Sequence, residues 1–202
     1  MSKKDLSPKQ LKTIVNLLFE VGMLAKTPRG GFYFLGSGTQ SVAEHIHRTT
    51  HIGYVLAQMA ADVDEAKILE MCLFHDLPEA RTSDLNYVHQ KYVVSNESKA
   101  INDLTGRLFF GGKIKNILAE YAVRKSKESL LAKDADQLEL LLSLCEESDT
   151  GNTRAVSWVP SCVKRLKTEQ AKTLAKVILK TASDEWWFEN RDGDWWVNRN
   201  GK

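Results

Sequence analysis

Apolar residues recur along most of this chain at the three- to four-residue spacing of amphipathic helices. The first such segment follows Ser7-Pro8, a typical helix start, and places Leu11 and Leu18 on one face. Further helices are expected from Ser41 onward, over 65–74, 95–109 and 113–123, from about 130 through Cys145, and from about 161 to 180. Strand signal is limited to short stretches, such as the one at Val93-Val94. The pattern predicts an all-α helical bundle.

The connection between the first two helices is long and contains unusual residues for a simple linker. It carries Arg29 and the aromatic run Phe32, Tyr33 and Phe34. Long connections are often functional. The alternative is a loop that is only anchored in the core by Phe32 and Phe34, so the pattern leaves both open.

Composition narrows the class of protein. The chain has 202 residues and a formal net charge of +2, which fits one domain and argues against a nucleic-acid polymer or a membrane as partner. Its three cysteines, Cys72, Cys145 and Cys162, show no CxxC spacing and are expected to be buried free thiols. The start lacks a signal-peptide pattern, and no apolar run approaches the ~20 residues of a membrane span. A cytoplasmic protein is therefore expected.

Polar residues interrupt the apolar pattern most clearly at His75-Asp76. The run Met71-Cys72-Leu73-Phe74 leads directly into this pair, and Pro78 disfavours helix for the residue before it. The pair should therefore lie at a helix end, where burial requires a partner for both side chains. Imidazole and carboxylate together suit a divalent ion in the manganese-to-zinc range, provided that other ligands exist.

Candidate partners occur on both sides of this pair. His45 lies on the apolar side of its helix, where a satisfied core histidine is the alternative. Asp134 and Asp136 interrupt a later apolar helix and point to different sides, and periodicity does not decide which one faces inward. Glu79 and Asp84 are candidates for proton transfer, or else residues of a solvated loop and a helix cap.

The order of these residues resembles the H…HD…D signature of the HD-domain metal-dependent phosphohydrolases. Within this superfamily, the sequence motifs are similar to those of the HD-domain 5′-deoxynucleotidases. The resemblance runs from about residue 8 to 180 and implies a single HD domain over 1–202, with an aromatic tail at 183–202. The matching stretches are Pro28-Arg29-Gly30-Gly31-Phe32, Ser41-Val42-Ala43-Glu44-His45, His75-Asp76-Leu77-Pro78-Glu79, Asp84 and Lys133-Asp134-Ala135-Asp136.

The resemblance implies a function and a role for each matching residue. The activity would be hydrolysis of deoxynucleoside 5′-monophosphates to deoxynucleoside and phosphate, with a small nucleotide as partner and a homodimer as assembly. One divalent ion (Mn, Co, Zn, Fe or Mg) would be bound. Glu79 and Asp84 would be the acidic catalytic residues, Arg29 would contact the phosphate, and Phe32 would lie near the sugar. The implied metal ligands are His45, His75, Asp76 and Asp136.

Two positions depart from the pattern of the group. Ser83 replaces the glycine that usually precedes the matching aspartate, and Phe32 replaces a tryptophan, which puts the sugar preference in question. The alternatives are an HD-fold nucleotide-binding or regulatory module with little turnover, or a hydrolase of another phosphorylated metabolite. The absence of a GYP motif after the HD pair argues against the cyclic-dinucleotide branch.

Overall fold

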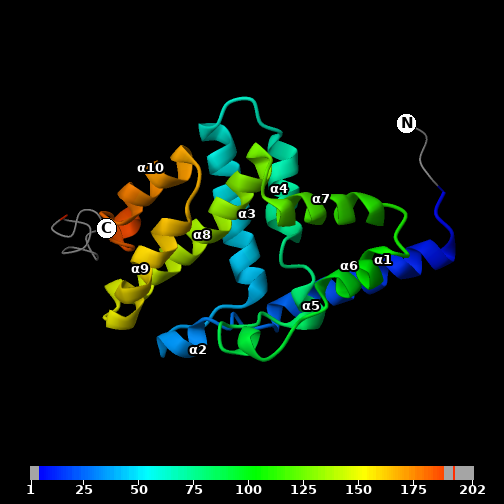
Figure 1. Ribbon diagram of the computed structural model, residues 1–202, viewed down its shortest axis with the longest axis horizontal. Helices are drawn as coiled ribbons and strands as arrows, with labels where there is room; N and C mark the ends of the chain where they lie inside the picture. The colour runs from blue at the N-terminus through cyan, green and yellow to red at the C-terminus, as the bar shows by residue number, and fades with distance from the viewer. Residues whose placement is uncertain (1–4, 189–192, 194–202) are drawn as a thin grey trace, which may run out of the picture.

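The computed structural model describes residues 5–188 and 193, and every regular element in this part of the chain is a helix, which confirms the all-α prediction. Figure 1 shows their arrangement. In chain order they are α1 (Pro8–Val21), η1 (Gly22–Ala25), α2 (Phe32–Leu35), α3 (Val42–Met59), α4 (Glu65–Phe74), α5 (Glu79–Thr82), η2 (His89–Lys91), α6 (Glu97–Thr105), α7 (Gly111–Val123), α8 (Lys127–Asp149), α9 (Thr153–Arg165), α10 (Glu169–Ile178) and α11 (Glu185–Phe188).

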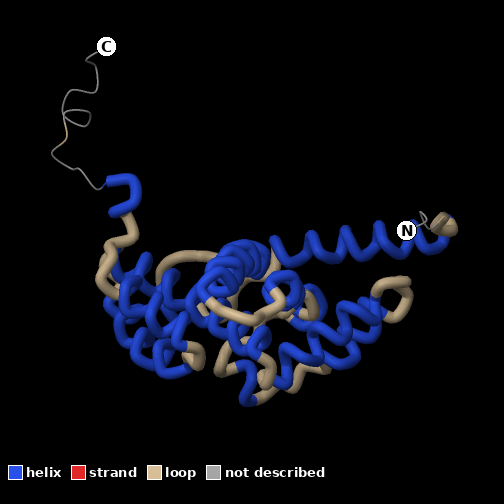
Figure 2. Tube along the Cα trace, turned by 90° about the horizontal axis from the view of Figure 1, so that it is seen from above, coloured by secondary structure: helices blue, strands red, loops and turns tan. Residues whose placement is uncertain are grey.

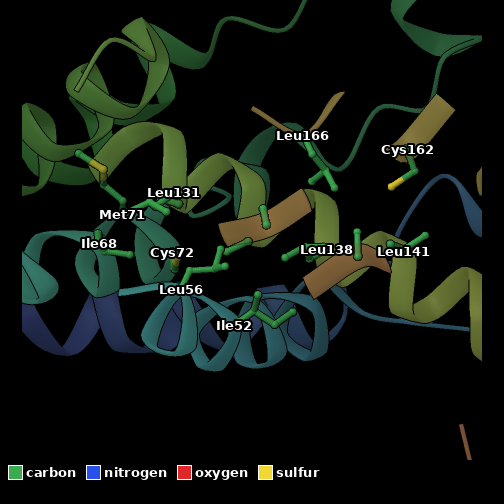
Figure 3. Packing of buried hydrophobic residues seen from close by; sticks show 14 of the residues in the cluster. Ile52, Leu56, Ile68, Met71, Cys72, Leu131, Leu138, Leu141, Cys162 and Leu166 are labelled. Atoms are coloured by element: carbon green, nitrogen blue, oxygen red, sulfur yellow. The ribbon is translucent and has the colours of Figure 1, made fainter. Parts of the chain in front are cut away.

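The centre of the molecule is the packing of α3, α4 and α8. Leu56 from α3, Met71 from α4 and Leu138 from α8 are fully buried and meet in one apolar cluster (Figure 3). Gly53 allows α3 and α4 to approach closely, since a Cβ at this position would lie 2.6 Å from Cys72 Sγ. Because the candidate ligands lie on α3 and α8 or directly after α4, this core fixes their relative positions.

The helix starts predicted at Ser7 and Ser41 are confirmed. Ser7 and Ser41 each accept a hydrogen bond from the backbone three residues on, and Gln10 and Glu44 complete the capping boxes. The range predicted for α4, 65–74, agrees with the structure. Cys72 and Cys162 are buried free thiols as expected, whereas Cys145 is half-buried.

One long helix from about 161 to 180 is a wrong prediction. The chain instead forms α9 and α10, with Pro160 inside α9 and Leu166 in extended conformation after it. Asp134 from α8 causes this break, because its carboxylate accepts hydrogen bonds from the backbone N–H groups of Lys167 and Thr168 at 3.0 and 2.7 Å. A side chain from another helix therefore ends the periodic pattern.

Two helix boundaries also differ from the predicted ones. The helix expected over 95–109 ends at Thr105, and the helix expected over 113–123 begins two residues earlier, at Gly111. Gly111 lies so close to the Thr105 carbonyl that a Cβ would be 1.9 Å from it. No strand forms at Val93-Val94.

The apolar faces at the two ends of the molecule are more exposed than the sequence suggested. None of the residues of α1 is buried, and Figure 2 shows this helix extending away from the rest of the chain. Trp186 and Trp187 in α11 are 84% and 52% exposed, so the start of the aromatic tail does not bury these side chains in the core. Trp195 and Trp196 lie outside the described residues. Within the described part, no helix combines the length and apolar character needed to cross a membrane.

Candidate functional site

Four side chains from three separate stretches meet beside the central core. His45 comes from the first turns of α3, His75 and Asp76 follow the end of α4, and Asp136 comes from α8. The Nε2 atom of His45 lies 3.3 Å from His75 Nε2, 3.2 Å from Asp136 Oδ1 and 3.5 Å from Asp76 Oδ2. His75 Nε2 lies 3.2 Å from Asp76 Oδ2. Ligand atoms of His45, His75 and Asp76 all lie within 4.8 Å of one another, and Asp136 joins them through its contact with His45.

The hydrogen bonds behind the two imidazoles determine which nitrogen faces this cluster. His75 Nδ1 lies 2.9 Å from the carbonyl oxygen of Cys72, which can only accept, so Nδ1 carries the proton. His45 Nδ1 lies 2.6 Å from a carboxylate oxygen of Glu139 and donates in the same way. In its neutral form, each ring then directs an Nε2 lone pair into the cluster. Two facing lone pairs and two carboxylates require a cation, and this donor set fits a divalent ion.

The electrostatics of the cluster lead to the same requirement. Burial and Arg29 lower the pKa of His45, but its hydrogen bonds to Asp136 and Glu139 outweigh them and raise the pKa to about 9. Burial raises the pKa of Asp136, but Lys133 and the histidines hold it well below its usual range. Without another cation the site would therefore bind a proton at His45, and a metal ion would have to displace it.

The turn after α4 places His75 and Asp76 because the helix stops there. The His75 N–H still bonds to the Met71 carbonyl, and Leu77 is buried with 2% exposure, which anchors the turn in the core. Pro78 then caps the short helix α5, so Glu79 begins a new direction of the chain. The predicted helix end at the HD pair is confirmed.

Arg29 reaches the cluster from the connection between α1 and α3. Backbone pairing between Pro28 and Ser41 fixes this connection against the start of α3. The Arg29 Nη1 atom lies 3.3 Å from Asp76 Oδ2 and 3.4 Å from Asp84 Oδ2. Burial lowers the pKa of Arg29, but Asp76 and Asp84 outweigh it, so the guanidinium stays charged. A buried fork of N–H donors beside the cluster can bind an oxyanion.

Asp84 and Glu79 lie on the same side of the cluster and are held differently. Asp84 Oδ2 accepts a hydrogen bond of 3.0 Å from the backbone N–H of Gly30, and a Cβ on Gly30 would lie 2.6 Å from the Asp84 carbonyl. Glu79 Oε2 is buried and has no hydrogen-bond partner among the described residues. Burial, together with Asp76 and Asp84, raises the pKa of Glu79 to about 10, so this group carries a proton at neutral pH.

A pocket of about 560 Å³ opens onto this cluster. Arg29, Asp76, Asp84 and Asp136 line one part of it, and Phe32 and Trp158 line another.

The connection that carries Phe32 is a short helix, α2, whose buried anchor is Leu35, while Phe34 is 40% exposed. The alternative of a loop anchored by both Phe32 and Phe34 is therefore wrong for Phe34.

The structure decides between the two aspartates of α8. Asp136 faces the cluster, whereas Asp134 caps the start of α10. Both are buried, so burial alone would not have separated them.

Glu139 is a site residue that the sequence reasoning missed. Its carboxylate is 1% exposed and accepts hydrogen bonds from His45, Arg48 and Gln40. Burial raises the pKa of Glu139, but the bonds to His45 and Arg48 outweigh it and lower the pKa to about 2. A signal existed, because Glu139 follows Asp136 by three residues and so lies on the same helix face.

Comparisons with known proteins agree with this geometry. The family model described as HD domain matches residues 21–178. A protein of Dictyostelium discoideum named 5′-deoxynucleotidase HDDC2 is 31% identical over 119 residues, which cover 53% of this chain and 62% of that protein. Its namesake from Danio rerio is 27% identical over 132 residues, covering 62% and 65%. The chain thus matches less than two thirds of the length of either relative.

Solved structures share the fold. A conserved hypothetical protein from Pyrococcus furiosus superposes with a TM-score of 0.70 at 28% identity, covering 82% of this chain and 97% of that one. A structure from Magnetospirillum magnetotacticum, titled a predicted metal-dependent phosphohydrolase, gives a TM-score of 0.68 at 20% identity over 86% and 95%, a likeness that concerns the fold alone. From the match over residues 21–178, the chain belongs to the HD domain family, as the order of His45, His75-Asp76 and Asp136 predicted.

Proposed function

We propose that this protein is a metal-dependent phosphohydrolase that cleaves deoxynucleoside 5′-monophosphates to deoxynucleoside and phosphate. The observation that carries the proposal is the meeting of two imidazole nitrogens, two carboxylates and Arg29 in one cluster, whose Asp76, Asp136 and Arg29 line the pocket. The names of the two curated relatives support the reaction and the substrate class.

The residues that would hold the divalent ion are His45, His75, Asp76 and Asp136. When bound there, such an ion supplies Lewis acidity toward a phosphoryl oxygen and makes hydroxide available near neutral pH. The mixed nitrogen and oxygen donors suit several divalent metals.

Arg29 and Glu79 would perform the next parts of the reaction. The Arg29 guanidinium has further N–H donors besides those facing Asp76 and Asp84, and these would orient the phosphate in the pocket. Charge then develops on the leaving 5′ oxygen as its bond to phosphorus breaks. Glu79 would donate a proton to that oxygen, because its pKa of about 10 keeps the proton on the carboxyl group at neutral pH. Asp84 would keep Arg29 aligned and accept hydrogen bonds from the attacking water.

The rest of the pocket would bind the nucleoside. Phe32 and Trp158 supply aromatic surface, and Gln137 and Asn86 supply hydrogen-bonding groups. A volume of about 560 Å³ lies within the usual range for small-molecule sites. A homodimer, implied by the resemblance, stays a prediction.

Phosphate release from a panel of nucleotides tests the proposal. We expect the full-length protein with manganese or cobalt to release phosphate from deoxynucleoside 5′-monophosphates, and to lose this activity with a chelator. Ribonucleotides and phosphorylated sugars in the same panel define the specificity. No release from any deoxynucleotide with any metal would contradict the proposal, and tight nucleotide binding without release would favour a regulatory nucleotide-binding module instead.

A further inference from the structure

Lys133 has no role in the reaction described so far, although it lies at the edge of the candidate metal centre. Its Nζ atom donates a hydrogen bond of 2.5 Å to Asp136 Oδ2, whereas the other oxygen of this carboxylate faces His45. Lys133 precedes Asp136 by three residues on α8, so the helix places both on one face. The side chain is 27% exposed and lines the pocket.

The surroundings of Lys133 hold its ammonium group at this place. Nζ lies 5.8 Å from the centroid of the Tyr121 ring, within the range of a cation–π contact. An ammonium has three N–H donors, and the bond to Asp136 uses one of them. Donors therefore remain for a group that enters the pocket.

Lys133 and Arg29 bring positive charge to the same pocket from different elements. Arg29 comes from the connection before α2 and contacts Asp76 and Asp84, while Lys133 comes from α8 and contacts Asp136. Each cation is thus paired with a different carboxylate of the candidate metal centre. A phosphate that binds in this pocket would therefore meet cations from two separate elements.

The balance of charges in the pocket indicates a need for a second cationic side chain besides Arg29. Asp76, Asp84 and Asp136 bring up to three negative charges, and a phosphate monoester adds nearly two more near pH 7. A divalent ion and Arg29 bring three positive charges, which balance the aspartates and leave the phosphate uncompensated. Lys133 supplies a further positive charge in the same pocket.

We propose that Lys133 is a catalytic residue whose ammonium contacts the phosphoryl oxygens of the substrate, together with Arg29. The proposal rests on the proposed phosphohydrolase activity of the same pocket. The bond between phosphorus and the leaving oxygen breaks, a water oxygen binds to phosphorus, and Lys133 only stabilises the charge that develops on the phosphoryl oxygens. The alternative is that Lys133 does no more than neutralise Asp136.

The two roles predict different changes when the charge is removed. If Lys133 only neutralises Asp136, the variant Lys133→Met changes metal affinity and leaves phosphate binding to the metal-loaded protein intact. If Lys133 contacts phosphate, the same variant weakens phosphate binding even when the metal is saturating. Methionine keeps most of the aliphatic length, so packing changes little.

The experiment compares Lys133→Met, Lys133→Arg and the wild type, each as full-length protein saturated with manganese. Inorganic phosphate is titrated by calorimetry, metal affinity is measured separately, and turnover is followed with p-nitrophenyl phosphate and deoxynucleotides. We expect Lys133→Met to bind phosphate at least about 10-fold more weakly and to lose at least as much in kcat/KM. Lys133→Arg, which keeps the charge, should recover part of both. Lys127→Met, at the exposed start of the same helix, is the matched control and should behave as wild type.

The outcomes separate this inference from the proposed function. If wild type binds phosphate but hydrolyses no deoxynucleotide, the proposed substrate is wrong, while weaker phosphate binding by Lys133→Met still supports the role of Lys133. Unchanged phosphate binding in helical Lys133→Met at saturating metal overturns the inference. Absence of phosphate binding by the metal-loaded wild type overturns it as well.

Discussion

The two sides of the candidate site hold their functional groups by different means. On one side, which we call the helix wall, His45, Asp136 and Glu139 project from α3 and α8 and are fixed by bonds between side chains. On the other side, the turn wall, His75, Asp76, Glu79 and Asp84 follow one another from the end of α4, and the side chains of His75 and Asp84 bond to backbone groups. The His75 ring bonds to the Cys72 carbonyl, and Asp84 bonds to the Gly30 N–H.

The difference places rigidity and reactivity in separate parts of the site. On the helix wall, the buried Glu139 carboxylate is saturated with donors, so it stabilises one orientation of His45. On the turn wall, Glu79 Oε2 lacks a partner among the described residues, and Ser83 has a positive φ of 59°. Strain and perturbed pKa values of this kind are concentrated at functional sites. We therefore expect substitutions in the two walls to separate chemistry from metal positioning.

The largest effect is expected from Asp76→Ala, which removes a candidate metal ligand from the turn wall. Turnover should fall by at least about 10³-fold, since losing the ion forfeits several kcal/mol of charge stabilisation. Elemental analysis should show loss of the metal, while circular dichroism should show unchanged helicity, because Asp76 lies outside the helices. Asp103→Ala, on the exposed side of α6, is the control. Full turnover by Asp76→Ala would mean that the reaction occurs elsewhere.

Glu79→Gln should separate activity from stability on the turn wall. As the proposed proton donor, Glu79 is expected to contribute about 10²-fold or more to the rate, which the variant loses. The buried carboxyl keeps its proton up to a pKa of about 10, whereas the unfolded chain releases it near the ordinary value of 4.5. The unfolded state thus binds fewer protons between these values, and metal-free wild type loses stability as pH rises through this window. Glutamine has no proton to release.

Thermal unfolding of the metal-free proteins from pH 5 to pH 9 measures this effect. We expect Glu79→Gln to become progressively more stable than wild type as pH rises, although its activity is lower. Glu97→Gln, at the exposed first turn of α6, should show no such trend. A constant difference between Glu79→Gln and wild type across the range would refute the raised pKa.

Glu139→Gln tests the helix wall and should act on metal binding more than on proton transfer. Partners of this kind behind a metal-binding histidine contribute about 10- to 100-fold to affinity, so we expect metal affinity to fall within that range. The physical reason is that the carboxylate fixes the proton on His45 Nδ1 and leaves Nε2 free. Nitrogen-15 NMR of the histidines reports the tautomer, and calorimetry reports the affinity.

The control for Glu139→Gln lies on the same helix. Glu146 contacts Arg48 from its exposed side, with 51% of its side chain accessible, and it does not reach His45. Glu146→Gln should therefore retain both metal affinity and tautomer. Equal losses in the two variants would indicate that Arg48, rather than the carboxylate on His45, maintains the site.

Local signals in the sequence predicted much of the fold and the centre of the site. Residues 65–74 form the predicted helix, and the serine caps of α1 and α3 are present, because these features depend on neighbours a few residues away. The order of His45, His75-Asp76 and Asp136, which matches that of the HD-domain family, predicted that these distant residues meet. The break between α9 and α10 escaped prediction, because Asp134 comes from another helix. Glu139 escaped for the same reason, since its partner His45 lies 94 positions away.

The smallest effect is expected from Ser83→Gly, which relieves backbone strain in the turn wall. Ser83 has φ 59° and ψ 163°, a region that glycine occupies without penalty and other residues enter at a cost of about 1–3 kcal/mol. Part of the gain is offset by the greater freedom of glycine in the unfolded chain. We therefore expect a net stabilisation of about 1 kcal/mol and a rise in Tm of about 2–4 °C. Ser98→Gly, inside α6, should instead destabilise slightly, so loss of stability in both variants would show that the turn is not strained.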